Sequence, residues 1–388
     1  MSLISKAALR EGEPNPVTIG FDAKRAFYNT SGLGNYSRNL IFALAKNFPE
    51  NFFYLFTPKT RNRIKLENEN QFKVIEPDLF VLKLMHPLWR RKYMLKDIKR
   101  QKVEIFHGLS QELPVGIEKS GIKSVVTVHD LIFLRFPGYY NWFDSRIYTR
   151  KLIHACAISD RIVAISNQTK DDLINYLEVS PEKVSVIYQG CSPYFRNNFS
   201  KEEIQRIVTK YNLPGRYLLY VGTVEERKNL LGIVKAFHIA NIDIPLIVIG
   251  RKTDSYYKNV LSFIKTHKLS NIIFKDRILD SELPVIYRKA ECFIYPSFFE
   301  GFGIPIVEAL VSGIPVITSK AGCFTEAGGP GSLYVDPHRP EEIGEAVIKV
   351  VNSKKLRDEM IATGTDYAQN FRDDVIAQAY MDLYHSVL

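Results

Sequence analysis

The chain has 388 residues, of which 46% are hydrophobic and 24% charged, a composition typical of a globular protein that excludes a disordered one. Its length predicts about two to three domains. No apolar run approaches the roughly 18 residues that a membrane span needs, and residues 1–16 lack the features of a signal peptide. We therefore expect a cytoplasmic protein, whose four scattered cysteines are reduced thiols without metal-ligand spacing.

The net charge of +10 suits three kinds of partner: nucleic acid, an anionic membrane surface or a phosphorylated substrate. The densest basic stretch is residues 89–100, where Trp89, Tyr93, Met94 and Ile98 recur at near-helical spacing. This pattern predicts an amphipathic basic helix, which is either a solvated helix face or a surface that docks on an anionic bilayer or a lipid-phosphate acceptor. The stretch is short for a continuous nucleic-acid surface, so we expect no nucleic-acid partner.

Short apolar runs alternate with helical patterns through the first half of the chain. A helix is predicted at residues 34–46, and strands are predicted at residues 17–21, 52–56, 104–106, 124–128, 161–165 and 184–187. This alternation indicates a parallel sheet that is covered on both faces. The polar segment 192–216 contains Pro193 and Pro214 and is predicted to be a linker.

The second half of the chain repeats the alternation. Strands are predicted at residues 217–221, 245–249, 272–274, 292–295, 314–317 and 333–335, and the final helices at residues 340–352, 355–369 and 373–388. The sequence therefore predicts an α/β protein with two open parallel sheets in tandem. Such sheets bind ligands at the carboxyl ends of their strands, and the cleft between the two domains is the expected site.

The motif with the most chemical content is Glu-Gly-Phe-Gly-Ile-Pro-Ile-Val-Glu at residues 300–308, which follows the predicted strand 292–295. Pro305 suits the first turn of a helix, so residues 300–303 are predicted to be a loop that leads into a helix N-terminus. Free N–H groups and the helix dipole favour an anion there, such as a diphosphate. Gly301 and Gly303 would let the backbone approach that ligand closely.

The two glutamates of this motif have different expected roles. Glu308, one turn into the helix, could accept two hydrogen bonds from a ribose diol. Glu300, on the loop, would lie nearer to a sugar attached to the phosphate. The alternative is that Glu308 only complements the helix dipole and Glu300 is a surface charge of the loop.

A second motif, Gly-Thr-Val-Glu-Glu-Arg-Lys-Asn at residues 222–229, places two adjacent cations before a predicted helix. A departing nucleoside diphosphate gains negative charge as the glycosidic bond breaks. Arg227 and Lys228, if they point at it, would stabilise the transition state without a metal. The alternative is that both are solvated surface charges.

Two weaker motifs lie in the first half. Gly32 and Gly34 follow the first strand and open the first helix, where they could form one wall of the cleft or serve only the turn. His129 ends the predicted strand 124–128 and could contact the sugar or the reacting centre, or be a hydrogen-bonded structural histidine. His107, at another strand end, has the same ambiguity.

Several motifs are missing from the sequence. It contains no Asp-x-Asp for a metal–diphosphate complex, no ATP-binding Gly-x-x-x-x-Gly-Lys-[Ser/Thr] and no Gly-x-Gly-x-x-Gly with a following ribose acid. We therefore expect neither a metal nor a cofactor.

Residues 300–308 resemble the Glu-x7-Glu motif of the GT-B glycosyltransferases of family 4, and residues 222–229 resemble that family's phosphate-binding loop. Residues 31–34, 128–131 and 164–170 are similar to its N-domain segments, and the resemblance covers residues 17–385. It implies two Rossmann-like domains whose parallel sheets face each other across a cleft, with the last helix returning to the N-domain. The implied limits are 17–195 with 373–388 for an acceptor-binding domain and 196–372 for a nucleotide-sugar-binding domain.

The resemblance also implies metal-independent transfer with retention of the anomeric configuration. Glu308 would bind the donor ribose, Glu300 the sugar hydroxyls, and His129 would lie near the anomeric carbon. Many relatives carry Arg where this chain has Thr223, so the cationic role falls on Arg227 and Lys228. The candidate catalytic residues are Glu300, His129, Lys228 and Arg227, and the candidate donor-binding residues are Glu308, Gly301, Phe302, Gly303, Ile304, Gly222, Gly32 and Gly34.

Similarity to bacterial polysaccharide mannosyltransferases favours GDP-mannose as the donor and a lipid-linked or growing glycan as the acceptor. The expected place of action is the cytoplasm, with peripheral contact at the inner face of the membrane through residues 89–100. Two other functions remain open. One is a nucleotide-sugar epimerase of the same fold, and the other is a non-enzymatic basic binding module.

Overall fold

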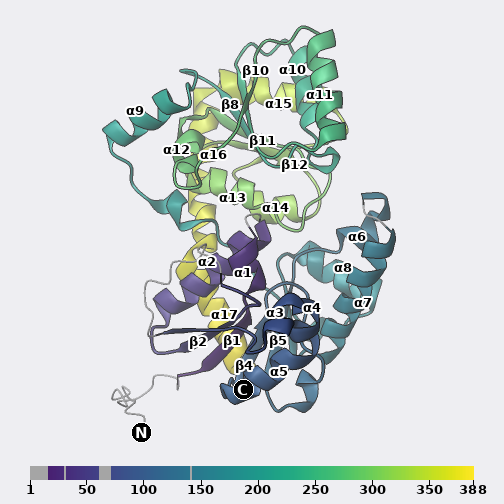
Figure 1. Cartoon of the computed structure of the whole chain (residues 1–388). Helices are drawn as coiled ribbons and strands as arrows, with labels where there is room; N and C mark the ends of the chain where they lie inside the picture. Colours follow the sequence, from purple (N-terminus) through teal and green to yellow (C-terminus); the bar gives the residue numbers. More distant parts are fainter. Residues whose placement is uncertain (1–15, 30–31, 61–70, 140–141) are drawn as a thin grey trace.

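The computed structural model describes residues 16–29, 32–60, 71–139 and 142–388. Two α/β domains lie one above the other, and the chain returns to the first domain through its last helix (Figure 1). Within these ranges, every helix is too short or too polar to cross a bilayer. The expectation about a signal peptide in residues 1–16 falls outside the described residues, except for Pro16, and so does Ser31 of the segment 31–34.

The first domain is built on a seven-stranded sheet in which every pairing is parallel, with the order β3-β2-β1-β4-β5-β6-β7. The strands are β1 (Thr18–Asp22), β2 (Phe52–Phe56), β3 (Phe72–Ile75), β4 (Ile105–Gly108), β5 (Lys123–Val128), β6 (Arg161–Ala164) and β7 (Val184–Val186). Successive side chains point to opposite faces, so Val125 and Val126 belong to two different hydrophobic clusters. Because helices cover both faces, the central strands are mostly apolar.

Helices cover both faces of this sheet. They are α1 (Lys24–Tyr28), α2 (Gly32–Asn47), α3 (Phe80–Leu84), α4 (His86–Leu88), a π-helix (Trp89–Tyr93), α5 (Met94–Arg100), α6 (Ile132–Arg135), α7 (Trp142–Ile158) and α8 (Asn167–Leu177). Short 3-10 helices span Ile117–Lys119, Pro137–Tyr139 and Pro181–Lys183. Ser166 caps α8, because its side chain accepts a hydrogen bond from the backbone N–H of Thr169.

The second domain has a six-stranded parallel sheet with the order β10-β9-β8-β11-β12-β13. Its strands are β8 (Leu218–Val221), β9 (Leu246–Ile249), β10 (Ile272–Lys275), β11 (Cys292–Tyr295), β12 (Val316–Ser319) and β13 (Leu333–Val335). Its helices are α9 (Lys201–Lys210), α10 (Leu230–Ile239), α11 (Asp254–Thr266), α12 (Leu283–Lys289), α13 (Ile304–Val311), α14 (Cys323–Gly328), α15 (Pro340–Asn352) and α16 (Lys354–Tyr367). Short 3-10 helices span Pro193–Arg196, Glu226–Lys228 and Ala368–Phe371. The predicted α/β class with two parallel sheets is confirmed.

The last helix, α17 (Asp373–Val387), belongs to the core of the first domain. The Tyr380 hydroxyl lies 2.7 Å from the hydroxyl of Tyr36 on α2, and the Tyr384 hydroxyl lies 2.7 Å from Nδ1 of His107 on β4. The return of the C-terminal helix to the N-domain is therefore confirmed. The limits 17–195, 196–372 and 373–388 stay predictions.

Residues 89–100 fit the first of the two alternatives, a solvated helix face, while a membrane contact through this segment stays a prediction. Trp89, Met94 and Ile98 are buried in the core of the first domain, whereas Tyr93 is 47% exposed. Arg90 is buried as well, and its guanidinium pairs with Asp22. The segment is a π-turn followed by α5, and its exposed side carries mainly charge.

Two other details differ from the prediction. The segment 192–216 includes α9, which lies on the second domain because Ile207 is buried in that domain's core. The edge strand β3 was not predicted, since only Ile75 in it is buried and its apolar run is short. An edge strand has a neighbouring strand on one side only and is less buried, so its apolar pattern in the sequence is weaker.

Candidate functional site

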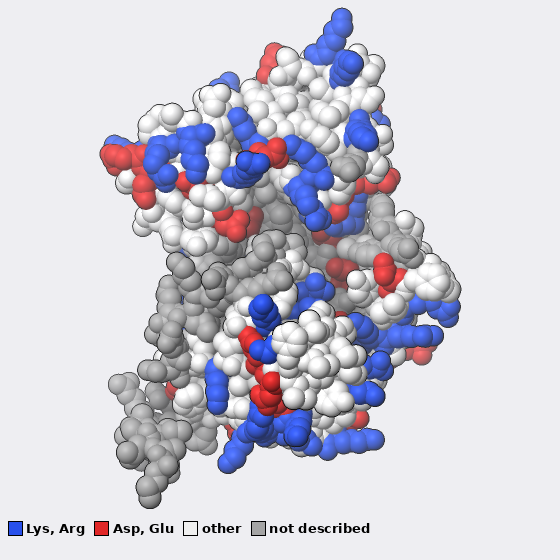
Figure 2. Space-filling view, viewed as in Figure 1, with Lys and Arg blue, Asp and Glu red and all other residues white. Residues whose placement is uncertain are grey.

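The candidate site lies where β8 and β11, neighbours in the second sheet, end beside the first domain. Figure 2 shows the molecule hollowed between the two domains. The loop after β8 carries Arg227 and Lys228, and the loop after β11 carries Glu300. Because the carboxyl ends of parallel strands meet at one edge of a sheet, the two loops are brought together.

Four side chains form one ionic cluster at this edge. Arg227 Nη1 lies 2.6 Å from Glu300 Oε2, and Lys228 Nζ lies 3.3 Å from Glu300 Oε1. The Tyr295 hydroxyl accepts a hydrogen bond from Lys228 Nζ at 2.7 Å and donates one to Glu300 Oε1 at 2.7 Å. The three charged side chains are only 13–17% exposed.

The charges of this cluster are fixed by their mutual contacts. Burial acts to raise the pKa of Glu300, but the positive charges of Lys228 and Arg227 and the hydrogen bonds outweigh it and lower the pKa to about 2. Burial acts to lower the pKa of Arg227, and the charges of Glu300 and Glu225 outweigh it, so the guanidinium stays protonated. Glu300 is therefore a carboxylate that orients two cations, and it holds no proton to donate near neutral pH.

Asn229 ties the two loops together. It adopts a left-handed backbone conformation with φ of 56° and caps α10, since its Oδ1 accepts a hydrogen bond from the Gly232 N–H. Its Nδ2 donates to the carbonyl oxygens of Pro296 and Pro337 at 3.1 and 2.7 Å. Asn229, itself buried, thereby holds the cation loop against the loop that carries Glu300.

Glu308 lies on α13, one turn beyond Ile304, as predicted from Pro305. Its Oε2 accepts a hydrogen bond of 3.0 Å from the Tyr287 hydroxyl. Burial raises the pKa of Glu308 to about 8, and the Tyr287 hydrogen bond offsets part of the effect. Its carboxyl group is thus largely protonated at pH 7, so it can donate as well as accept a hydrogen bond.

The loop between the two glutamates is shaped by its glycines in different ways. Gly303 has a φ of 121°, a conformation that only glycine adopts readily. A Cβ atom on Gly301 would lie 2.2 Å from the carbonyl oxygen of His129 in the first domain. Gly301 therefore permits close contact between the domains, a role that the sequence did not suggest.

The remaining candidates of the second domain surround this loop. Phe302 is buried and stacks on Tyr188 of the first domain, with ring centroids 5.3 Å apart. Ile304 is the first residue of α13 and is partly exposed. Gly222 lies under the cluster, where an added Cβ would approach Lys228 Cδ to 3.2 Å.

His129 is held by hydrogen bonds on both ring nitrogens. Its Nε2 lies 2.9 Å from the carbonyl oxygen of Leu109, and its Nδ1 accepts from Gln189 Nε2 at 3.2 Å. Burial lowers its pKa to about 4, so the imidazole is neutral. His107 is likewise buried between Tyr384 and Thr127, and burial lowers its pKa to about 3. The structural alternative named for both histidines fits these contacts, while a role of His129 at the reacting centre stays a prediction.

The two N-domain glycines differ from each other. A Cβ atom on Gly34 would lie 2.0 Å from the carbonyl oxygen of Asn29, so this glycine is required by the turn that opens α2. Gly32 is exposed, and nothing within 4 Å would meet an added Cβ. Of the two, only Gly32 leaves open space for a ligand.

The structure adds two carboxylates that the sequence analysis missed. Asp130, directly after His129, is close enough to Arg227 and Glu300 for their charges to affect its pKa, which burial raises. Its position at the end of β5 could have signalled it. Glu326 on α14 accepts hydrogen bonds from Asn167 N, Asn167 Nδ2 and Gln168 N at 2.7, 2.8 and 3.2 Å, at the N-terminus of α8. No local pattern marks Glu326.

The Glu326 contact joins the two domains beside the site. Ser166 Oγ, at the same end of α8, donates to the carbonyl oxygen of Gly301 at 2.7 Å. The Cys323 thiol, on the same helix as Glu326, donates to the Glu300 carbonyl at 3.2 Å. The backbone on both sides of the Glu300–Gly301 peptide is thus held at the domain interface.

Among the described residues, no three His, Cys, Asp or Glu side chains are grouped as metal ligands would be.

Glycosyltransferase family models match most of the chain. The family model "Glycosyl transferases group 1" matches residues 201–367, and "Glycosyltransferase Family 4" matches residues 30–193. O-antigen chain mannosyltransferase B of Escherichia coli is 27% identical over 366 residues, which span 89% of this chain and 93% of that protein. O-antigen chain mannosyltransferase RfbU of Salmonella typhimurium is 30% identical over 256 residues, 65% of this chain and 67% of that protein.

Solved structures share the fold at lower identity. Alr3699/HepE of Anabaena, in complex with UDP and glucose, superposes with a TM-score of 0.73 at 16% identity and covers 95% of this chain and 100% of that one. WaaG, a glycosyltransferase involved in lipopolysaccharide biosynthesis, superposes with a TM-score of 0.68 at 14% identity, over 95% of this chain and 99% of that one. With its two parallel-sheet domains and both family segments, the chain belongs to the family 4 glycosyltransferases of the GT-B fold.

Proposed function

We propose that this glycosyltransferase moves a mannosyl group from GDP-mannose to a hydroxyl group of a lipid-linked or growing glycan. The donor bond would be broken with retention of configuration and without a metal. Two relatives are named O-antigen chain mannosyltransferases, which supports mannose and a glycan acceptor. The structural neighbour that binds UDP and glucose supports a nucleoside-diphosphate sugar, and the base remains the point to test.

The observation that carries the proposal is the pair of cations held by Glu300 and Tyr295 at the carboxyl ends of β8 and β11. Negative charge develops on the diphosphate as the sugar leaves it. Charges that are already oriented stabilise that state without reorganisation. Arg227 and Lys228 would thus do the work that a divalent ion does in metal-dependent transferases.

The proposed donor pose extends from this cluster along α13. The diphosphate would lie over residues 301–304, at the N-terminus of the helix, and the ribose would reach Glu308. Because Glu308 carries a proton near neutral pH, it can donate one hydrogen bond to the ribose diol and accept another. The sugar would lie near Glu300 and the first domain.

Retention is best explained by attack on the same face of the sugar. The acceptor hydroxyl oxygen would bond to the anomeric carbon as the bond from that carbon to the phosphate oxygen breaks. The hydroxyl proton would pass to the departing phosphate oxygen. Glu300 is engaged by two cations and ionised, so we assign it sugar positioning and orientation of the cations and not nucleophilic attack. A trapped glycosyl–enzyme bond would contradict this assignment.

The four cysteines are unpaired, buried thiols, which suits a reducing compartment and the proposed action in the cytoplasm. A lipid-linked acceptor would place the reaction at the inner face of the membrane.

A thermal-shift screen against UDP, GDP, ADP and their sugars, with a metal chelator present, tests the proposal. Tight binding stabilises the native state by about 2.7 kcal/mol at a hundredfold excess over Kd. We expect GDP and GDP-mannose to raise the melting temperature most, and the chelator to leave the shift unchanged. Absence of any shift would contradict a nucleotide-sugar enzyme. Conversion of a donor without acceptor would instead indicate the epimerase.

A further inference from the structure

Both ring nitrogens of His129 are engaged, and one of the two contacts comes from the segment that leads into the second domain. Nε2 lies 2.9 Å from the backbone carbonyl oxygen of Leu109, and Nδ1 lies 3.2 Å from Nε2 of Gln189. A carbonyl oxygen can only accept a hydrogen bond, so the proton of the neutral ring is on Nε2. Nδ1 therefore carries a lone pair, which accepts a hydrogen bond from the Gln189 amide group. The two contacts together favour one tautomer of the ring.

The orientation of the His129 ring is also fixed by Tyr36 of α2. The two rings meet edge to face with their centroids 4.6 Å apart. The Tyr36 hydroxyl lies 2.9 Å from Thr127 Oγ1 and 2.7 Å from the hydroxyl of Tyr380 on α17, which runs beside α2 (Figure 1). His129 and Gln189 are only 6% and 5% exposed. These contacts leave the imidazole ring one orientation.

Gln189 lies between β7 and the first crossing of the chain into the second domain. Its neighbour Tyr188 stacks on Phe302 of the second domain, with ring centroids 5.3 Å apart. Its other neighbour, Gly190, packs against the second crossing, since an added Cβ would lie 3.4 Å from the Phe371 carbonyl oxygen. The backbone on both sides of Gln189 is therefore held by contacts between the domains, and the amide group transmits that position to the histidine.

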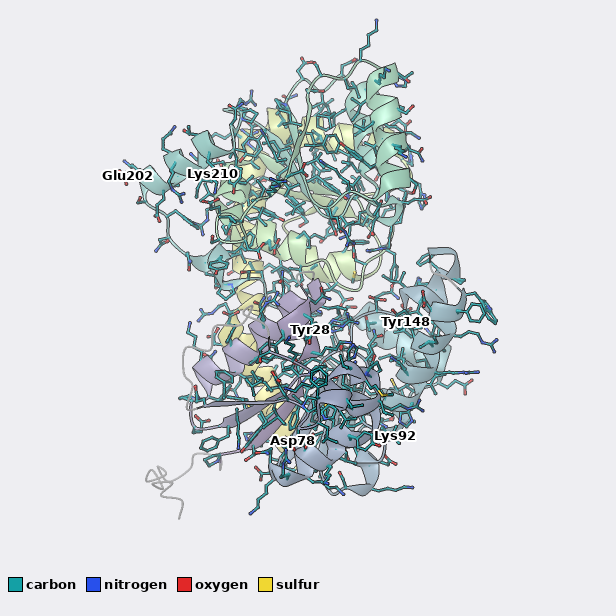
Figure 3. All side chains as sticks on the ribbon, viewed as in Figure 1. Tyr28, Asp78, Lys92, Tyr148, Glu202 and Lys210 are labelled. Carbon is teal, nitrogen blue, oxygen red and sulfur yellow. The ribbon has the colours of Figure 1, made fainter. Side chains whose placement is uncertain are left out.

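Basic groups around His129 oppose its protonation. Burial lowers the pKa of His129 to about 4, and the positive charge of Arg25 on α1 acts in the same direction. His107 on β4 interacts with the ring as a second base, so protonation of one opposes protonation of the other. Helix α1 ends at Tyr28, which Figure 3 labels at the edge of the first domain that faces the second. The His129 ring is therefore neutral near the edge where the domains meet.

The acidic groups near the ring do not reverse this effect. Burial raises the pKa of Asp130, the next residue, and its Oδ1 accepts a hydrogen bond from the Ile132 N–H. Burial raises the pKa of the Tyr36 hydroxyl well above its ordinary value, so that group is uncharged. Gln189, the group in contact with Nδ1, has the shape of a glutamate without its charge. A carboxylate in its place would favour the imidazolium.

A neutral and oriented ring suits the proposed reaction. Positive charge develops on the sugar ring as its bond to the departing group breaks, and an imidazolium near the anomeric carbon would oppose that charge. We propose that Gln189 is a positioning residue for the transfer, whose amide holds His129 as the neutral, Nε2-protonated tautomer at the reacting centre. This inference rests on the proposed function and on the place near the anomeric carbon that the family resemblance implies for His129. It adds the residue that orients the ring.

NMR of the histidine rings tests the tautomer with the full chain and needs neither donor nor acceptor. Long-range proton–nitrogen correlations of protein labelled at histidine distinguish rings protonated on Nε2, on Nδ1 and on both nitrogens. The wild type is compared with Gln189→Met and Gln189→Glu, and His129→Asn identifies the His129 signals by their loss. Gln189→Met keeps a side chain of similar length and removes the amide, whereas Gln189→Glu replaces a donor with an acceptor.

We expect the wild-type ring of His129 to be neutral at pH 7, with its proton on Nε2. In Gln189→Glu the ring should take up its second proton at a pH higher by about one to three units, because an opposite charge favours the protonated form. In Gln189→Met the form protonated on Nδ1 should appear, since that nitrogen loses its donor. A wild-type ring with its proton on Nδ1, or a tautomer unchanged in both variants, would overturn the proposal.

Transfer kinetics with varied donor test the consequence for the reaction. Gln189→Met should lower kcat about tenfold with the donor KM little changed, the size expected for one hydrogen bond that orients a group in the transition state. For Gln189→Glu, the ratio of its kcat to that of the wild type should fall as the pH is lowered, because the protonated ring becomes more populated.

The matched control is Asn39→Asp. Asn39 and Asp373 line the same small cavity as Gln189, so this variant adds a negative charge there and leaves the Gln189 amide in place. It should match the wild type in both measurements, and all variants are checked for an unchanged melting temperature. Wild-type kcat in Gln189→Met, or a Gln189→Glu ratio that is the same at every pH, would overturn the positioning role. Absence of transfer by the wild type would contradict the proposed function instead, while the ring measurement still decides whether Gln189 sets the tautomer.

Discussion

Glu300 and Glu308 belong to one motif, but their surroundings give them opposite protonation states. Glu300 contacts two cations and a tyrosine hydroxyl, and its pKa falls to about 2. Glu308 accepts a hydrogen bond from the Tyr287 hydroxyl, and burial raises its pKa to about 8. A carboxylate pinned between cations is suited to orientation, whereas a protonated carboxyl group is suited to hydrogen bonding with a diol.

This difference predicts different kinetic effects for the two substitutions. Glu308→Ala should raise the donor KM by about tenfold with kcat little changed, because it removes hydrogen bonds made equally in the ground and transition states. Glu300→Ala should lower kcat by about a hundredfold, because Arg227 and Lys228 lose the group that aims them. Steady-state kinetics with varied donor measures both.

Glu225→Ala is the matched control, since the Glu225 side chain also pairs with Arg227 but is 31% exposed. Among the hydrogen bonds and ion pairs of the described residues, its only contact with Lys228 is through its backbone carbonyl, which the substitution keeps. It should leave kcat closer to the wild-type value than Glu300→Ala does. A KM effect for Glu300 and a kcat effect for Glu308 would reverse the assignment.

The pKa of Glu308 also predicts how stability depends on pH. A carboxyl whose folded pKa lies above its unfolded value binds its proton more tightly when folded, so the stability it contributes is lost as pH rises from about 4.5 to about 8. Relative to Glu308→Gln, which does not titrate, the wild type should lose up to roughly 1 kcal/mol per pH unit in this window. Unfolding of both proteins in urea at several pH values measures the difference. A difference that does not vary with pH would contradict the raised pKa.

At the scale of elements, α8 and α14 form the contact that joins the domains beside the site. The Glu326 carboxylate occupies the N-terminus of α8, where free N–H groups and the helix dipole favour a negative charge. Ser166 at the same helix end holds the Gly301 carbonyl. The contact between the domains and the position of the loop of residues 300–303 are therefore linked through one helix terminus.

Removing this carboxylate should loosen the interface. Glu326→Ala should weaken the free energy of the contact between the two domains by about 2 kcal/mol, as expected for the loss of hydrogen bonds to a charged group. Amide hydrogen exchange should then become faster at Asn167 and Gln168, and the donor KM should rise several-fold. Glu345→Ala, an exposed glutamate on α15, is the control and should change neither. Unchanged exchange in Glu326→Ala would show that the domains do not depend on this contact.

Strands that helices cover on both faces were predicted well from the sequence. Strands such as β5 and β11 are continuously apolar because helices cover both faces, and their limits were close to those observed. Two elements lack such a buried apolar pattern: strand β3 at the sheet edge, and helix α3, whose apolar residues are exposed. The apolar spacing of residues 89–100 fits a core-facing helix as well as a membrane-facing one, and the tertiary structure places Trp89, Met94 and Ile98 in the core.

The parts of the site that follow from the order of the strands could be predicted from the sequence. Glu300, Arg227 and Lys228 meet because both loops follow neighbouring strands of one parallel sheet. The link through Tyr295 and the contact of Glu326 with α8 depend on side-chain direction and on domain packing. These are long-range features that no local pattern encodes. Gly301 was expected to let the backbone approach a ligand, and Gly34 to form a wall of the cleft or serve only the turn. Both have close backbone neighbours, and their roles in donor binding stay predictions.

At the scale of the whole molecule, the chain is divided into two α/β domains, and its last helix returns to the first of them (Figure 1). The second domain holds the cluster of Arg227, Lys228 and Glu300. Helix α17 returns to the first domain, so the chain crosses between the domains twice, near residues 192–200 and 368–373. In the proposed reaction, the second domain would hold the donor and the first domain the acceptor.

The most direct test of this account is the anomeric configuration of the product, measured by proton NMR after incubation with GDP-mannose and a glycan acceptor. The account predicts release of GDP only when acceptor is present, and a new linkage with the α configuration of the donor. A product of inverted configuration would contradict the proposed same-face attack. Alteration of GDP-mannose without acceptor would contradict the assignment as a transferase.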